Sequence, residues 1–580
     1  MSLPPLANLL AVRRDAPGGT DALERRLRED GRFAEVLRPA PGWVVGIAPL
    51  PHGTPDPPGV RSAGLVFAEG RDAVGDPERA ARLGRERPEG LGELPGDFTF
   101  LAFAGDGSVT AVRSAGGLAP LYVADEGRVL ATRLRWTLPY LAAVELDPLP
   151  NAIWMTGTPL FPEGRTFLRG VRMLDRGSFA RVPSQAGAVR TGVYWDPRPD
   201  RLRPPSEDRL REHAGRLRAA LLERLDADLD PGGGNLLTYS GGIDSSSLLG
   251  LAGGTLGRPV SALSLIPTGG PALERELAYL ESGQERARLV HHVQIPMSAA
   301  DRSDWVRDSV SPGFHVPHPA LNRLAEVMRE TDVRVVFGGE FGDEVGGSKY
   351  TLPDWAALTP ASRLLNLRRL PRGPRDWVRW ARTRFSRSSI PYPSELPAWM
   401  HPDVRAEYEA WLGGVARRSA ADRRSLAHLD LRAGMDGFTA MNWEACSELG
   451  LRRSIPFFTR AALEVAYDCH PGELIGPGFR RLTRAALARD VPASNLLRDD
   501  PGRWDVPDSA PEPWEGTLPP ATGSILDASW HPRPPGPVDA LTGLFLWQLV
   551  RFAQSVGLGA GGDTGKSPKT TGIDTAGGRP

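Results

Sequence analysis

The stretch Tyr239-Ser240-Gly241-Gly242-Ile243-Asp244-Ser245-Ser246-Ser247 decides how this chain is interpreted. It follows an apolar run, 235–238, that predicts a short buried strand, and it precedes 247–252, which is typical of the first turns of a helix. A glycine turn between a strand and a helix favours an anion, because free N–H groups and the helix dipole point at one spot. Gly241 and Gly242 allow close approach to a phosphate, and Ser240, Ser245 and Ser246 add hydroxyl donors.

Asp244 adds a carboxylate that would repel phosphate, so it predicts a Mg²⁺ ion bridging the two. The spacing is not that of a Walker loop, which ends in Gly-Lys-Ser/Thr. It resembles the SGGxDS pyrophosphate loop of N-type ATP pyrophosphatases. The resemblance implies ATP and Mg²⁺ as cofactors, cleavage of ATP between the α and β phosphates, and nucleotide contacts at Leu263 and Gly339. The alternative without a function is a serine-rich turn that binds no ligand.

Downstream, apolar runs at 260–266, 289–295 and 333–337 predict further strands, with helical patterns at 272–288 and 319–330. Strands alternating with helices predict a parallel, doubly wound sheet, whose ligands bind beyond the carboxyl ends of the strands. The run 338–347 carries three acids directly after a strand, which is unfavourable unless a cation neutralises them. It resembles the SGEGSDE loop of asparagine synthetases. That resemblance gives Asp343, with Asp244, the role of metal ligand, and it gives Glu340 the role of taking a proton from the attacking amine.

Residues 1–200 predict a layered β domain, from apolar runs at 42–48, 64–68, 98–103, 109–112, 121–123 and 129–132. The segments 94–98, 113–122 and 131–132 resemble the GDF, RDxxGxxPLYY and ASE landmarks of class II glutaminase domains, which are α+β domains of the Ntn type. With the loop downstream, the order resembles the asparagine synthetase B family. We therefore expect a glutaminase-like domain over 1–200, an α/β synthetase domain of the adenine nucleotide α-hydrolase type over 201–557, and a disordered tail over 558–580.

The resemblance departs from the family at two positions. Glutaminases of this type use an N-terminal Cys as nucleophile, whereas position 2 here is Ser2, a poor nucleophile without a base. The family lysine that contacts the triphosphate, two residues after the match to Arg498, is replaced by Asp500. Lys349 and Arg503 are the candidate substitutes for it.

Without ammonia from glutamine, the attacking amine is expected to belong to the carboxylate-bearing molecule itself. β-Lactam synthetases and the macrolactam cyclases of lasso peptide biosynthesis are relatives that do this. The chain length and the arginine- and tryptophan-rich segment 351–430 favour the cyclase. It would adenylate an Asp or Glu side chain of a core peptide for attack by the peptide's N-terminal amine, with a leader-binding protein and a leader protease as partners. The family's glutamine-dependent asparagine synthetase remains the alternative.

Composition limits the other function classes. The 70 basic and 70 acidic residues balance, which gives no reason to expect a nucleic-acid or membrane partner. The two cysteines, Cys446 and Cys469, predict core residues in a reducing compartment, and we expect a cytoplasmic protein. A tRNA-modifying ATP pyrophosphatase should show a basic tract and paired reactive cysteines. A catalytically dead scaffold should have lost Asp244 or Asp343.

Overall fold

The computed structural model describes the chain in blocks. These are residues 7–14, 19–49, 65–70, 75–155, 162–185, 187–196, 203–267, 269–287, 289–296, 332–346, 399–421, 435–474, 480–498 and 525. The helix expected at 319–330, most of segment 351–430, Ser2, Lys349, Asp500, Arg503 and the tail 558–580 lie outside these residues.

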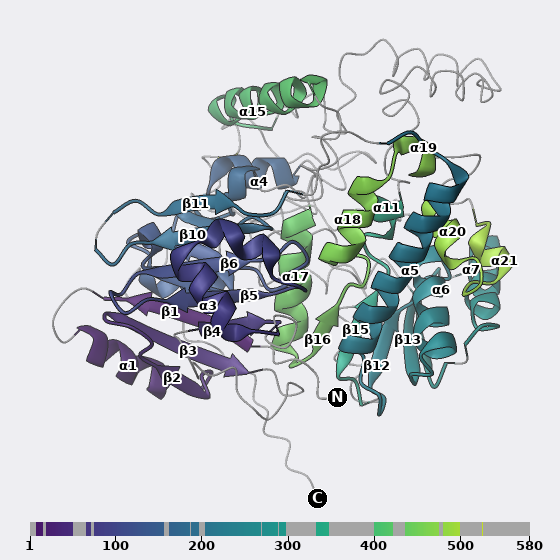
Figure 1. Cartoon of the computed structure of the whole chain (residues 1–580), viewed down its shortest axis with the longest axis horizontal. Coiled ribbons are helices and arrows are strands. Elements are labelled where there is room, and N and C mark those ends of the chain that lie inside the picture. Colours follow the sequence, from purple (N-terminus) through teal and green to yellow (C-terminus); the bar gives the residue numbers. More distant parts are fainter. Residues whose placement is uncertain are drawn as a thin grey trace, which may run out of the picture.

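Two antiparallel sheets form the N-terminal half (Figure 1). The first has the order β2-β3-β1-β8-β7-β9, with bounds β1 Ala7–Arg13, β2 Glu35–Leu37, β3 Trp43–Pro49, β7 Tyr122–Ala124, β8 Val129–Ala131 and β9 Val171–Met173. The second has the order β11-β10-β6-β5-β4, with bounds β4 Leu65–Glu69, β5 Thr99–Phe103, β6 Val109–Arg113, β10 Ser178–Val182 and β11 Arg190–Val193. All six strands expected here from the sequence are present, with ends shifted by at most one residue.

Alternation along these strands explains the layering. In β1, Leu9 and Ala11 belong to a core shared with Leu101 and Ala111 of the second sheet, whereas Leu10 and Val12 belong to a separate outer core. That outer core contains residues of α1 and α4, and the outer face of the second sheet packs on α3. The bounds are α1 Gly19–Glu29, α3 Pro77–Glu86 and α4 Pro148–Met155, with 3₁₀ turns η1 Pro88–Glu93, η2 Asp125–Gly127, η3 Leu134–Tyr140 and η4 Pro162–Gly164. The half is therefore a helix–sheet–sheet–helix sandwich.

The second half is built on a parallel sheet with the order β14-β13-β12-β15-β16. The strands are β12 Asn235–Thr238, β13 Val260–Ile266, β14 His292–Pro296, β15 Val335–Gly338 and β16 Arg452–Ser454. Its helices are α5 Glu207–Asp228, α6 Ile243–Leu249 with the π-helical continuation η5 Gly250–Thr255, α7 Gly270–Gly283, α11 Gly342–Gly346, α15 Pro402–Ala421, α17 Met435–Glu448, α18 Arg460–Asp468, α19 Pro471–Leu474, α20 Arg481–Leu487 and α21 Ala493–Leu496. The expected α/β class with a parallel sheet is confirmed.

Two expected boundaries are wrong. The third strand was expected from Leu289, but β14 begins at His292, and Val290 is 56% exposed at the edge of the sheet. The helix expected over 272–288 ends at Gly283, a residue type that terminates helices. Buried Ala287 and Leu289 continue the apolar pattern beyond that end without continuing the helix.

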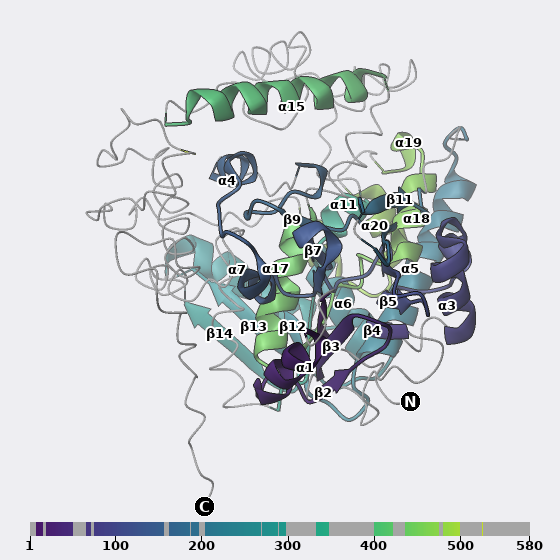
Figure 2. The same ribbon diagram turned by 90° about the vertical axis from the view of Figure 1, so that its left-hand side faces the viewer.

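Helix α17 lies between the two halves (Figure 1). Glu444 of α17 accepts a hydrogen bond from Tyr122 of the first sheet at 2.9 Å, and Trp443 donates one to Asn8 at 3.1 Å. Asp436 pairs with Arg176 at 2.5 Å and with Arg113 at 3.1 Å. Figure 2 shows α15 above α4, where Tyr408 belongs to the outer core. None of the described helices is both long enough and apolar enough to cross a bilayer.

Candidate nucleotide site at the carboxyl ends of the parallel strands

The predicted anion cradle has the expected strand–turn–helix form. β12 ends at Thr238, the turn follows, and Gly242 caps α6, whose axis continues into η5. Gly241 has a φ of +66°, and a Cβ there would lie 2.9 Å from Cβ of Tyr279, so both conformation and space require glycine. Ser240, Ser245 and Ser246 lie around this turn, and the Ser245 hydroxyl accepts a hydrogen bond from the Ser240 N–H at 3.2 Å.

Asn495 of α21 holds the turn in shape, and sequence reasoning missed it. Its buried amide donates to the carbonyls of Gly241 and Tyr279, both at 2.8 Å. Arg498 donates to the Ser240 carbonyl at 3.3 Å and pairs with Glu276 at 2.7 Å. Nothing in the composition of 492–498 marks Asn495 as a contact of a turn 254 positions earlier in the chain.

The acidic loop packs directly against the cradle. β15 ends at Gly338, and a Cβ at Gly339 would lie 2.8 Å from Cβ of Asp244. A Cβ at Gly342, the first residue of α11, would lie 2.2 Å from Cγ of Asp244. Only glycine permits this approach, and the contact brings the two predicted loops together at one edge of the sheet.

Asp244 and Asp343 converge on a single cation. Both carboxylates contact the guanidinium of Arg480, which has a φ of +60° immediately before α20. Oδ1 of Asp244 is buried and has no hydrogen-bond partner among the described residues. Burial raises the pKa of the Asp244 carboxyl, with Arg480 opposing the shift and Glu344 adding to it. Arg480 was not predicted to lie at the metal site, because no local pattern connects it with Asp244, 236 positions away.

These residues fit the predicted magnesium ion. Mg²⁺ prefers carboxylate oxygens, and Asp244 supplies a buried oxygen without a partner close to a second carboxylate. Asp244 and Asp343 would hold the ion, which would supply charge neutralisation for the phosphates. Both carboxylates contact the guanidinium of Arg480, Asp244 at Nη1 and Asp343 at Nη2, so a positive charge already lies between them.

Glu340 belongs to the same acidic loop, two residues after the end of β15. One of its oxygens, Oε1, pairs with Arg453 of β16. The other, Oε2, is buried without a hydrogen-bond partner in the described part of the chain.

The side chain of Leu263 packs in the core with Leu236 and Val336, and the Leu263 carbonyl accepts the Tyr239 N–H at 2.9 Å. The nucleotide contacts expected of Leu263 and Gly339 remain predictions, as do the roles of Lys349 and Arg503, which lie outside the described residues.

One other group of potential metal ligands is present in the described part of the chain, formed by buried His213, Cys469 and Glu473. Glu473 already accepts hydrogen bonds from Arg209, from His213 at 3.0 Å and from the His470 N–H at 3.1 Å. The cluster is therefore satisfied by the protein itself. Cys446 is likewise a free buried thiol, and burial raises its pKa to about 11.

Comparison with known proteins agrees with this geometry. The family model described as asparagine synthase matches residues 214–529, more than half of the chain. The chain belongs to the asparagine synthase family. The match begins within α5 and extends past the cradle, the acidic loop and α21.

Curated relatives include proteins described as putative asparagine synthetase [glutamine-hydrolyzing] from Mycobacterium bovis and from two strains of Mycobacterium tuberculosis. Each is 27% identical over 433 residues, which is 66% of this chain and 62% of the relative. This asparagine synthase family member therefore spans less than two thirds of those relatives. Among solved structures, NMN synthetase from Francisella tularensis matches with a TM-score of 0.18 and 18% identity, covering 24% of this chain and 58% of that one.

Proposed function

We propose that this chain uses ATP to form amide bonds, releasing AMP and pyrophosphate. A substrate carboxylate attacks the α phosphate, and an amine then attacks the resulting acyl adenylate. The observation that carries the proposal is the contact of Asp244 and Asp343 with one cation, Arg480, beside a glycine turn that donates N–H groups. Donors and cations fixed at the α–β bridge offset charge there without reorganising, and one such donor contributes about 3 kcal/mol to a barrier.

Glu340 is suited to the second step. An attacking amine must lose a proton as the C–N bond forms, and a carboxylate beside it can take that proton. The orientation of Oε1 is set by the ion pair with Arg453, while Oε2 is buried and has no partner among the described residues. A buried acceptor of this kind is costly unless a donor reaches it during the reaction. The amine would be that donor.

We further propose that the amine and the carboxylate belong to one peptide, so that the product is a macrolactam of the lasso peptide type. Residues 1–445 contain no cysteine, so none of the antiparallel strands or the segments between them offers a thiol for glutamine hydrolysis. Cys446 and Cys469 are buried in the other half, and burial raises the pKa of each thiol. A core peptide is then the substrate, with a leader-binding protein and a leader protease as partners in the cytoplasm.

A second candidate is asparagine synthesis from aspartate, and a third is a β-lactam synthetase-like closure of a small amino acid. The name of the mycobacterial relatives favours the asparagine reading. In that case the nitrogen must come from free ammonia or from a glutaminase nucleophile other than a cysteine of residues 1–445. The reactive cysteine pair expected of a tRNA-modifying enzyme finds no support in the burial of both thiols.

Mass spectrometry of the products distinguishes these candidates. Purified protein with MgATP is incubated in parallel with L-aspartate and ammonium chloride, with L-aspartate and glutamine, and with linear peptides that have a free N-terminal amine and an internal Asp or Glu. The cyclase reading expects loss of one water from a peptide with stoichiometric AMP. Formation of asparagine in place of a cyclised peptide would replace the cyclase proposal with asparagine synthesis. If no AMP forms with any of these substrates, amide synthesis from them is contradicted.

A further inference from the structure

Two adjacent arginines of β16 are both buried, Arg452 at 4% exposure and Arg453 at 2%. Neighbouring side chains on a strand point to opposite faces, so the two guanidinium groups serve different surroundings. β16 runs parallel to β15, with Arg453 paired to Val336 and Ser454 to Phe337. Each buried guanidinium needs an anionic partner, because desolvation of an unpaired charge is expensive.

Arg453 faces the candidate site. Its Nη2 donates to Oε1 of Glu340, two residues beyond the end of β15. The side chain of Arg453 is 1% exposed and that of Glu340 is 12% exposed, so solvent screens this ion pair weakly. The Nε and Nη1 of Arg453 have no hydrogen-bond partner in the described parts of the chain. Within those parts, Glu340 is therefore the hydrogen-bond acceptor that orients this guanidinium.

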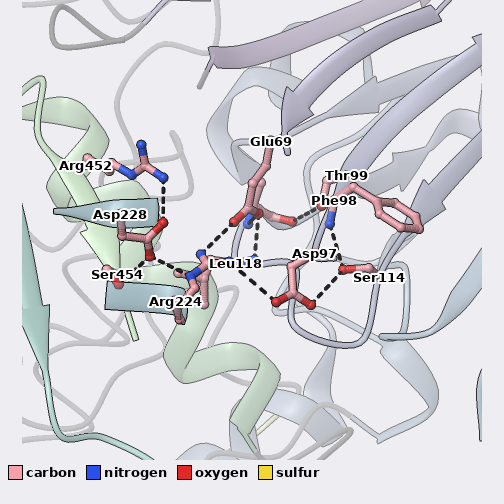
Figure 3. A network of polar contacts seen from close by, with 12 residues as sticks. Glu69, Asp97, Phe98, Thr99, Ser114, Leu118, Arg224, Asp228, Arg452 and Ser454 are labelled. Atoms are coloured by element: carbon pink, nitrogen blue, oxygen red, sulfur yellow. Dashed lines mark hydrogen bonds and ion pairs between the residues drawn. The ribbon is translucent and has the colours of Figure 1, made fainter. Parts of the chain in front are cut away.

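Arg452 faces the antiparallel half (Figure 3). Its Nη2 donates to Oδ1 of Asp228 at 2.6 Å, and Oδ2 of Asp228 accepts from Ser454 and from Arg224, both at 2.5 Å. Arg224 in turn lies 3.4 Å from Asp97, which precedes β5, and 3.7 Å from Glu69, the last residue of β4 in the second antiparallel sheet.

The far end of this network is fixed by main-chain donors. Oε2 of Glu69 accepts the N–H groups of Leu118 at 2.7 Å and Ala119 at 2.9 Å. Oδ1 of Asp97 accepts the Arg460 N–H at 3.2 Å. The network therefore joins the antiparallel half to both ends of β16, at Arg452 and at Ser454, while Arg453 between them points to the acidic loop.

We propose that Arg453 is a positioning residue that fixes the Glu340 carboxylate for the amide-forming step, and that the antiparallel half braces β16 for this purpose through Arg452, Ser454 and Asp228. The inference rests on the proposed function and assigns a use to the antiparallel half that does not involve glutamine. A positioning residue of the second step should leave the first step intact. In the proposed function, adenylation depends on the cradle, Asp244 and Asp343, and within the described parts of the chain Arg453 forms its ion pair with Glu340 and not with either aspartate.

The test separates the two steps in Arg453→Met, Arg453→Lys and Glu340→Gln. Adenylation is followed as exchange of labelled pyrophosphate into ATP, and amide formation as product, using L-aspartate with ammonium chloride and the linear peptides described above. We expect Arg453→Met to lower amide formation about 10- to 100-fold, less than the roughly 10²- to 10⁴-fold contribution of a general base itself, while exchange changes less than about threefold. Arg453→Lys should recover part of the loss. The double variant with Glu340→Gln should be no worse than Glu340→Gln alone, because both changes remove one function.

Equal loss of exchange and amide formation in Arg453→Met would overturn the inference and leave the proposed function standing, because that pattern indicates a general structural role. Absence of both activities in the wild type would instead contradict the proposed function.

Hydrogen exchange of the ligand-free protein tests the inference independently of activity: Arg453→Met should increase amide exchange over 339–346 and leave exchange over 240–246 unchanged. Arg334→Gln, which removes an exposed arginine just before β15, is the matched control and should change neither segment. Unchanged exchange over 339–346 in Arg453→Met would overturn the inference.

Discussion

The network around Asp228, which connects Arg452 and Ser454 with Arg224, Glu69 and Asp97, and the nucleotide cradle are both buried groups of charges. They differ in whether each acidic oxygen has a partner. Every carboxylate oxygen of Glu69, Asp97 and Asp228 has a partner within the protein. In the cradle, Oδ1 of Asp244 and Oε2 of Glu340 have none among the described residues. Most buried polar groups of a folded protein have partners, so unpartnered acidic oxygens beside the glycine turn indicate where a ligand would complete the structure. In the network around Asp228, the atom without a described partner is Nη1 of Arg452, a donor of a guanidinium that is already paired. We therefore assign a role in stability to the network around Asp228 and a role in catalysis to the cradle.

Removing Asp228 should break the satisfied cluster most severely. Asp228→Ala leaves the buried guanidinium of Arg452 and that of Arg224 without their shared anion. We expect a loss of about 3–5 kcal/mol in the free energy of unfolding, measured by urea denaturation. Asp226 lies on α5 like Asp228 but is half-exposed, and it pairs with Arg258. Asp226→Ala should therefore cost at most about 1 kcal/mol in the free energy of unfolding. Similar losses for both variants would contradict the assigned role of the network.

A methyl group at Gly339 should damage the cradle while sparing the interface. Its Cβ would lie 2.8 Å from Cβ of Asp244 and 2.9 Å from the Ser245 nitrogen, so one of the two loops must move. Overpacking of this kind costs about 1–3 kcal/mol, and we expect pyrophosphate release by Gly339→Ala to fall at least about tenfold. Gly215→Ala in α5, where no heavy atom lies within 4 Å of the added Cβ, should keep full activity and gain up to about 1 kcal/mol of stability. Full activity in Gly339→Ala would contradict the close packing of the loops.

The pH dependence of stability sharpens the comparison within the network. Burial raises the pKa of Glu69. The folded protein therefore keeps the carboxyl proton of Glu69 to higher pH than the unfolded chain, whose glutamates titrate at about 4.3. The contribution of Glu69 is then most favourable below about pH 4.3 and declines as pH rises through the folded pKa. Relative to Glu69→Gln, the wild type should lose about 1.4 kcal/mol per unit of pKa shift over that window.

Asp228 should show the opposite sign. Burial acts to raise its pKa, but Arg224 and Arg452 outweigh burial and hold the pKa below its ordinary value. Its contribution is present above the unfolded pKa of about 3.9 and is lost as pH falls through the folded pKa. Urea unfolding at a series of pH values for Glu69→Gln and Asp228→Asn tests both signs. Parallel curves for the two variants would show that the carboxylates do not differ in this way.

Local patterns predicted the parts of this structure that depend on local sequence. β12 and β13 have the bounds expected from their apolar runs, and Gly241, Gly339 and Gly342 of the two loops lie where a Cβ would collide. The partners of the acids were not predictable, since Arg452 lies 224 positions from Asp228 and Arg480 lies 236 positions from Asp244. No periodicity connects residues that far apart, and so many arginines in one chain offer too many equivalent pairings.

The identity of the spent nucleotide tests the central claim most directly. Wild-type protein with MgATP and the substrate panel should convert ATP into AMP and pyrophosphate, followed by phosphorus NMR of the reaction mixture. Asp244→Asn should form both products at least about a hundredfold more slowly, the effect typical of losing one group that stabilises charge at a reacting phosphate or carbonyl. Accumulation of ADP and inorganic phosphate, or an unchanged rate in Asp244→Asn, would contradict cleavage between the α and β phosphates at this cradle.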